Sequence, residues 1–251
     1  MEYTVVFERR ELLWSALACI LPTALVMGLA ASVAADTLQL GAPYVARVVA
    51  VYVAGTALLL PGLLACHPFP SLGPANAVTA ARGAMVALLA GLLGTRAAGA
   101  AGAATVVAAG ALILDGVDGA LARRTRMASR FGARFDMETD ALFTAVLSVL
   151  AWQLGRVGAW VLLSGALRYA FVAAGRLEPR LRRPLPESRL RKTVAVAQMV
   201  ALVVVIAPVG TPMLRTAVAG AALAALVGSF ARDIRWLLRS APLRDTAVPR
   251  A

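Results

Sequence analysis

Four aspartates lie close together in an otherwise apolar chain: Asp115, Asp118, Asp136 and Asp140. The first pair is spaced i, i+3 and the second i, i+4, so each pair can lie on one face of a helix. Two such helices side by side would bring four carboxylates together, and this group would repel itself without a cation. Oxygen ligands with no neighbouring His or Cys favour Mg²⁺ or Mn²⁺, and four carboxylates suffice for two ions.

Glycines and arginines are interleaved with these acids. Gly116, Gly119 and Gly132 would let backbone approach a phosphate-bearing ligand closely, and Arg123 could bind a second anionic group with two hydrogen bonds. A paired metal site of this kind polarises a phosphate and stabilises both the attacking and the leaving oxygen. The alternative for any single aspartate is a solvated ion pair with a nearby arginine. Four aspartates at these spacings favour the metal site.

The amino-acid composition of the chain is typical of a membrane protein. Hydrophobic residues make up 60% of the 251 residues and charged residues 15%, far from the usage of soluble domains. Eight apolar segments are long enough, with their flanks, to cross a bilayer as helices. They are residues 12–35, 48–66, 77–95, 97–114, 141–155, 157–174, 193–209 and 216–231. The composition therefore predicts an all-α, polytopic membrane bundle of about eight transmembrane helices.

The organisation we expect has three parts: an N-terminal transmembrane hairpin over residues 1–66, a membrane domain over residues 67–240, and a polar cytoplasmic tail over residues 241–251. The first apolar run ends in AASVAAD, which is similar to a signal-peptide cleavage site. Its length favours an uncleaved helix instead. Both cysteines, Cys19 and Cys66, lie inside apolar runs, so we expect small core residues and no disulfide.

The distribution of positive charge predicts the orientation. With a cytoplasmic N-terminus, 21 of the 25 basic residues fall on the cytoplasmic side. The acidic segment then faces the cytoplasm. The net charge of +12 is explained by contact with anionic lipid headgroups or substrates, without nucleic acid. All but one of the basic residues are arginine, which indicates a bacterial source and hence the inner, cytoplasmic membrane.

The acidic segment resembles the signature of the CDP-alcohol phosphotransferases (CDP-alcohol phosphatidyltransferases). The pattern D-x-x-D-G-x-x-A-R, eight residues, G-x-x-x-D-x-x-x-D is matched at every fixed position by Asp115, Asp118, Gly119, Ala122, Arg123, Gly132, Asp136 and Asp140. A second stretch, PANAVTAAR, resembles the N-x-x-T-x-x-R that opens the first core helix, at Asn76, Thr79 and Arg82. The resemblance covers residues 74 to about 240 and implies a six-helix core, which leaves the hairpin outside it.

The resemblance implies a reaction and roles for the matched residues. An acceptor hydroxyl attacks the β-phosphorus of a CDP-alcohol, commonly CDP-diacylglycerol, and CMP leaves, as in phospholipid biosynthesis. Asp115, Asp118 and Asp136 would bind metal, and Asp140 would contact the second metal and act as base. The CDP-alcohol would be held by Asn76, Thr79, Arg82, Gly119, Ala122, Arg123 and Gly132. The resemblance also implies that the protein forms a homodimer.

Four basic residues are candidates for the acceptor, for which glycerol phosphate and inositol phosphate are the expected choices. Arg189, Arg191 and Lys192 lie in SRLRKT, similar to the basic stretch before the fifth core helix of the family, and could hold an acceptor phosphate. The alternative is a positive-inside anchor. Arg168 interrupts an apolar segment, so it should face the bundle interior or a water-filled cleft, or else serve as a structural partner for a buried Asp or a carbonyl.

Two other functions compete with the transferase. A cation transporter could also use intramembrane carboxylates, but such sites usually lie at the bilayer midplane between repeated helices. Here the acids lie at a helix boundary and the sequence has no repeat. An inactive member of the family, retained as a structural partner, is the second alternative, against which the eight intact positions argue.

Overall fold

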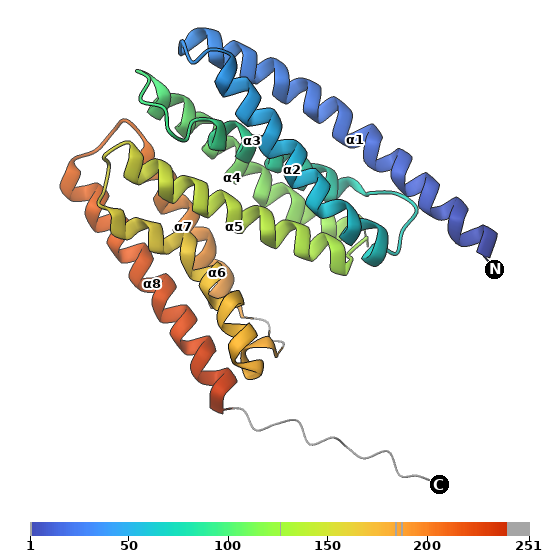
Figure 1. Cartoon of the computed structure of the whole chain (residues 1–251). Coiled ribbons are helices and arrows are strands. Elements are labelled where there is room, and N and C mark those ends of the chain that lie inside the picture. Colours follow the sequence, from blue (N-terminus) through green and yellow to red (C-terminus); the bar gives the residue numbers. More distant parts are fainter. Residues whose placement is uncertain (1, 126, 184, 187, 240–251) are drawn as a thin grey trace.

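The computed structural model describes residues 2–125, 127–183, 185–186 and 188–239, and for residues 2–8, 118–120 and 122–125 it describes the backbone alone. These residues form an all-helical bundle (Figure 1). Its α-helices are α1 (Glu2–Thr37), α2 (Ala42–Cys66), α3 (Pro74–Gly91), α4 (Ala100–Thr125), α5 (Arg130–Gln153), α6 (Leu162–Leu177), α7 (Arg189–Ile206) and α8 (Pro212–Arg239). Two short 3-10 helices, η1 (Ala159–Val161) and η2 (Pro179–Arg182), precede α6 and follow it.

Four of these helices are apolar enough to cross a bilayer by length and composition alone. They are Arg9–Thr37, Ala42–Cys66, Ala100–Val117 and Pro212–Arg239. Their outward faces carry large apolar side chains, such as Leu25 and Leu58, which are 65% and 82% exposed. On helices of this length and hydropathy, an apolar outer surface indicates contact with lipid. The protein is therefore an integral membrane protein, and the expected all-α membrane bundle is confirmed.

Helix α3 forms the centre of the bundle, and small residues allow this. It packs against α1, α2, α4 and α5, and its alanines and valines are mostly buried. On the facing helix α4, Ala104, Ala108 and Ala111 are fully or nearly fully buried at helical spacing, so the two backbones approach closely. Figure 1 shows α1 and α2 on one flank, α8 on the other, and α5 between them.

The N-terminal hairpin is fastened to α3 through α2. The Tyr44 hydroxyl donates to the carbonyl of Leu88 at 3.2 Å, and the Arg47 guanidinium donates to the carbonyl of Leu93. Gly91 makes the close packing possible, because a Cβ there would lie 2.4 Å from the Val48 side chain. The hairpin therefore packs tightly against the core at this end.

Helix α5 starts earlier than its apolar segment. Its first residues, Arg130 to Asp140, include five charged side chains, but the hydroxyl of Ser129 caps the helix by accepting a hydrogen bond from the backbone N–H of Gly132 at 2.9 Å. Ser129 also binds Nδ1 of His67 at 3.2 Å, which ties the loop after α2 to the start of α5. The cap thus fixes where the acidic residues of α5 lie.

Candidate active site

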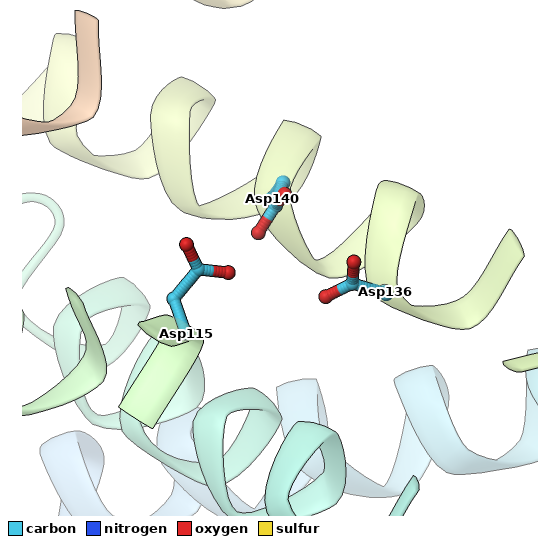
Figure 2. Close-up of side chains that lie close together, drawn as sticks. All are labelled: Asp115, Asp136 and Asp140. Atoms are coloured by element: carbon cyan, nitrogen blue, oxygen red, sulfur yellow. The ribbon is translucent and has the colours of Figure 1, made fainter. Parts of the chain in front are cut away.

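Three of the four predicted carboxylates converge between two neighbouring helices. Asp115 comes from α4, and Asp136 and Asp140 come from consecutive turns of α5 (Figure 2). One oxygen of each carboxylate lies within 4.8 Å of the others. The expectation that two helices would bring these acids together is confirmed for the three residues.

Arg82 of α3 balances the charge of this group. Its Nη2 lies 2.7 Å from Asp115, its Nη1 lies 2.7 Å from Asp136, and Nη2 also contacts Asp140. The side chain of Arg82 is 2% exposed. A buried arginine needs anionic partners, and three carboxylates this close need a cation, so each explains the other. The sequence associated Arg82 with the CDP-alcohol, and that role stays a prediction; the structure shows the side chain in contact with all three carboxylates.

The carboxylates also remain accessible from one side. The side chain of Asp136 is 43% exposed and that of Asp140 is 31% exposed, whereas Arg82 below them is enclosed. All the ligand atoms are oxygens, and their separation suits a hard divalent cation. The three residues therefore fit the Mg²⁺ or Mn²⁺ that the sequence predicts, and a charged ligand can approach from the exposed side.

Asn76, Thr79 and Gly132 lie at the contact between α3 and α5. Asn76 and Thr79 are 5% and 3% exposed. The Asn76 amide donates to the carbonyl of Leu72 at 2.6 Å, and its Oδ1 lies so close to Gly132 that a Cβ there would stand 2.7 Å away. Gly132 is thus required for the approach of α5 to α3, one turn before Asp136.

Gly132→Ala should therefore destabilise the protein and displace the acidic residues of α5. Overpacking of this kind costs about 1–3 kcal/mol, and we expect a lower melting temperature in detergent together with reduced activity. Gly102→Ala in α4 is the matched control, since a Cβ there meets no atom within 4 Å and Ala favours a helix. Equal melting temperatures for the two variants would show that the contact with Asn76 does not limit the packing.

Four signature residues lie outside the described side chains. Asp118, Gly119, Ala122 and Arg123 belong to the part of α4 for which the backbone alone is described. Their predicted roles, in metal binding for Asp118 and in CDP-alcohol binding for the others, stay predictions.

Two of the four basic residues considered for the acceptor have carboxylate partners. Arg168 of α6 lies 2.6 Å from Glu138 of α5, and Arg191 of α7 lies 3.2 Å from Asp233 of α8. These pairs hold neighbouring helices together. The partner of Arg168 is thus a glutamate whose side chain is 41% exposed, not the buried Asp or carbonyl named as the alternative.

Arg189 and Lys192 differ from these two residues. Both are exposed, and neither has a carboxylate within 4.0 Å among the side chains that the structure describes. They lie in the first turn of α7, which begins after Ser188, whose hydroxyl accepts from the backbone N–H of Arg191. Of the four acceptor candidates, Arg189 and Lys192 are therefore the two whose positive charge is available to a ligand.

Two features of the site region were not found from sequence. Arg82 was predicted to bind the CDP-alcohol, but its pairing with the acids was not predicted. The second is the pairing of Asp233, 8% exposed in α8, with Arg191, although a buried acid in a membrane helix needs a cation. For Arg82 the signal was a charged residue inside the apolar segment 77–95, whereas Asp233 follows the apolar segment 216–231 among arginines, where the sequence has no comparable signal.

One of the two cysteines predicted to be core residues lies at the surface. Cys19 is half-buried, but Cys66 at the end of α2 is exposed and is not a core residue. Both thiols are free, as expected.

Comparison with known proteins identifies the family. Residues 72–229, more than half of the chain, match the family model described as CDP-alcohol phosphatidyltransferase. No curated protein and no solved structure matches the chain. The family decides between the transferase and a cation transporter, and its members generally use divalent metals. The chain belongs to the CDP-alcohol phosphatidyltransferase family, whose members transfer a phosphatidyl group from a CDP-alcohol to an alcohol.

Proposed function

We propose that the protein transfers the phosphatidyl group of CDP-diacylglycerol to the hydroxyl of a phosphorylated acceptor, glycerol phosphate or inositol phosphate, in phospholipid biosynthesis. The observation that carries the proposal is the convergence of Asp115, Asp136 and Asp140 within 4.8 Å on two adjacent helices. The family match supports the reaction type, and the exposed side of the site gives access to a polar substrate.

The phosphatidyl group passes directly from the donor to the acceptor, without a covalent intermediate on the enzyme. The acceptor oxygen forms a bond to the β-phosphorus, the bond from that phosphorus to the bridging oxygen breaks, and CMP leaves with the electron pair. The acceptor proton passes to Asp140, the innermost carboxylate of α5. Positioning and charge stabilisation are the main contributions that such a transfer asks of a protein.

Asp115, Asp136 and Asp140 would hold divalent metal, with Asp118 as the fourth ligand, and two ions are expected. Bound metal supplies charge neutralisation for the diphosphate and acidifies the acceptor hydroxyl. Asn76, Thr79, Gly119, Ala122, Arg123 and Gly132 would bind or shape the site of the CDP-alcohol. Arg82, which contacts all three carboxylates, would orient them.

The acceptor phosphate would bind to Arg189 and Lys192, which have no carboxylate partner among the described side chains. The orientation with the site toward the cytoplasm of a bacterial inner membrane is supported by the distribution of basic residues. The core domain would then comprise residues 67–240, and homodimers are expected as in the family.

The proposal is tested by CMP release from the purified protein with CDP-diacylglycerol, Mg²⁺ or Mn²⁺, and a panel of acceptors. Glycerol phosphate or inositol phosphate should give at least about tenfold more CMP than unphosphorylated glycerol or inositol, because bonds to charged groups contribute about 1.5–3 kcal/mol each. In Arg189→Gln/Lys192→Gln this preference should disappear while the KM for CDP-diacylglycerol is retained.

CMP release from an unphosphorylated acceptor alone would overturn the assignment of the acceptor. Binding of CDP-diacylglycerol without CMP release from any acceptor would support an inactive member of the family instead.

A further inference from the structure

A large groove lies beside the contact between the N-terminal hairpin and the rest of the bundle. It has a volume of about 770 Å³ and lies between α2 and α5, with α3 as its floor. The two helices run alongside each other in Figure 1, and the end of α2 lies next to the start of α5. Leu58 and Leu142, which line the groove, are 82% and 41% exposed, so it opens sideways toward lipid.

The wall of the groove changes character along its length. Its body is apolar, formed by side chains such as Leu59 and Leu63 of α2 and Phe135 of α5. At the end where α5 begins, Arg130 and Arg134 line it; both are exposed, and neither has a carboxylate within 4.0 Å among the described side chains. This combination of an apolar trough and a cationic end suits one kind of ligand: a lipid with an anionic phosphate.

Glu138 is the acid that lines the groove, and its charge is already balanced. It lies 2.6 Å from Arg168 of α6, so the lining keeps the net positive charge of Arg130 and Arg134. These three α5 residues recur every four positions and therefore share one helix face.

The groove is separate from the acidic site. Asp136 and Asp140 follow Arg134 and Glu138 by two residues each, a rotation of about 200° around the helix. None of the three converging carboxylates lines the groove. The wall from α2 comprises residues that precede the family match, which begins at residue 72. The hairpin accordingly supplies one wall of the groove, whereas the floor from α3 and the wall from α5 belong to the family match.

We propose that this groove is a binding site for an anionic phospholipid of the surrounding bilayer, with an acyl chain along α2 and α5 and the phosphate at Arg130 and Arg134. Along α2 the lining extends from Val51 to Cys66, about 22 Å at 1.5 Å per residue, enough for a chain that spans one leaflet of about 15 Å. The volume falls within the range of about 300–1,000 Å³ that small-molecule pockets have. The bound lipid fills the gap between hairpin and core.

Two glycines allow the groove to be filled without disturbing the fold. Gly55 of α2 and Gly83 of α3 line it, and a Cβ at either position meets no atom within 4 Å. Leucine at both positions should block the acyl chain. Gly28→Leu in α1 is the matched control, because a Cβ there also meets no atom within 4 Å and the residue does not line the groove.

Cys66 provides a local probe of occupancy, since it lines the groove at its charged end and is exposed. The experiment uses full-length protein with Cys19→Ala, purified in detergent, and measures the rate of Cys66 modification by a maleimide as phospholipid is added. Phosphatidylglycerol should slow the reaction at least about fivefold, and phosphatidylcholine should require about tenfold more lipid for the same protection, as the loss of charged contacts predicts.

Two variants separate the phosphate from the acyl chain. In Arg130→Gln/Arg134→Gln phosphatidylglycerol should protect no better than phosphatidylcholine, whereas Arg235→Gln/Arg239→Gln, the same change of charge in α8, should leave the preference unchanged. In Gly55→Leu/Gly83→Leu neither phospholipid should protect, while Gly28→Leu behaves like the parent. Native mass spectrometry of the same samples should show about one phosphatidylglycerol fewer per chain in the blocked variant.

Three results would overturn the proposal. Equal protection by the two phospholipids would remove the role of Arg130 and Arg134, and full protection in the blocked variant would place the lipid elsewhere. If CDP-diacylglycerol displaced phosphatidylglycerol from Cys66, the groove would belong to the donor site. Catalysis enters none of these readouts, so failure here is distinguishable from failure of the proposed transferase activity.

Discussion

Asp140→Asn should lower acceptor-dependent CMP release by about a thousandfold or more. General bases contribute about 10²–10⁴-fold, and the same change removes one negative ligand from the expected metal site. Asparagine preserves the size of the side chain and one oxygen, so the contact with Arg82 can persist and the fold should be kept. The loss would then report on proton transfer and metal binding.

The measurement is CMP release at saturating acceptor, with CDP-diacylglycerol binding and the melting temperature recorded for the same preparation. Asp36→Asn, an exposed acid at the end of α1, is the control for removing one carboxylate and should keep full activity. If Asp140→Asn retained more than a tenth of the activity, Asp140 would not be the base, and Asp136 would be the next residue to test.

The spacing of the aspartates was enough to predict most of the acidic site. Helical periodicity places Asp136 and Asp140 on one face, and self-repulsion demands a positive partner nearby. What the sequence left open was the source of that partner. Arg82 lies 33 residues before Asp115, and the relative rotation of α3, α4 and α5 decides that it points at the acids. That rotation depends on contacts such as Gly132 with Asn76, which periodicity alone does not reveal.

The apolar runs predicted which segments form helices better than they predicted the residues at which those helices begin and end. The run from residue 141 to 155 marks the apolar part of α5, but the helix begins at Arg130 because Ser129 caps it. An apolar run records contact with lipid or core, whereas a helix start depends on the cap. Helix α4 likewise extends beyond its apolar part, at its other end, and continues through Thr125.

For the N-terminal hairpin, composition predicted the helices but not how they pack. Its two helices were predicted from hydropathy, but neither their packing through Tyr44 against α3 nor the groove next to α5 could be expected. The groove lies between α2 and α5, and glycines such as Gly55 and Gly83 leave part of its volume unfilled, which the apolar pattern alone does not reveal.

Arg82→Ala should cause the largest loss of stability of any single change at the site, and divalent metal should reverse part of it. Removing one partner of a buried ion pair costs about 3–5 kcal/mol, and here three carboxylates lose the same partner. In EDTA we expect the melting temperature in detergent to fall by about 10 °C. Mn²⁺ should restore at least half of the fall, because a divalent ion among the carboxylates supplies the missing charge.

The comparison with wild type makes this prediction specific to the acidic site. Wild type should gain less from Mn²⁺ than Arg82→Ala does, since its carboxylates already contact Arg82, and Mn²⁺ bound per chain, followed by electron paramagnetic resonance, should be as high in the variant or higher. Arg168→Ala breaks a partly exposed pair with Glu138 and should lower stability less, with no response to Mn²⁺ beyond that of wild type. Equal shifts with Mn²⁺ in wild type and Arg82→Ala would mean that arginine and metal do not share these carboxylates, and the assignment of Asp115, Asp136 and Asp140 as metal ligands would have to be abandoned.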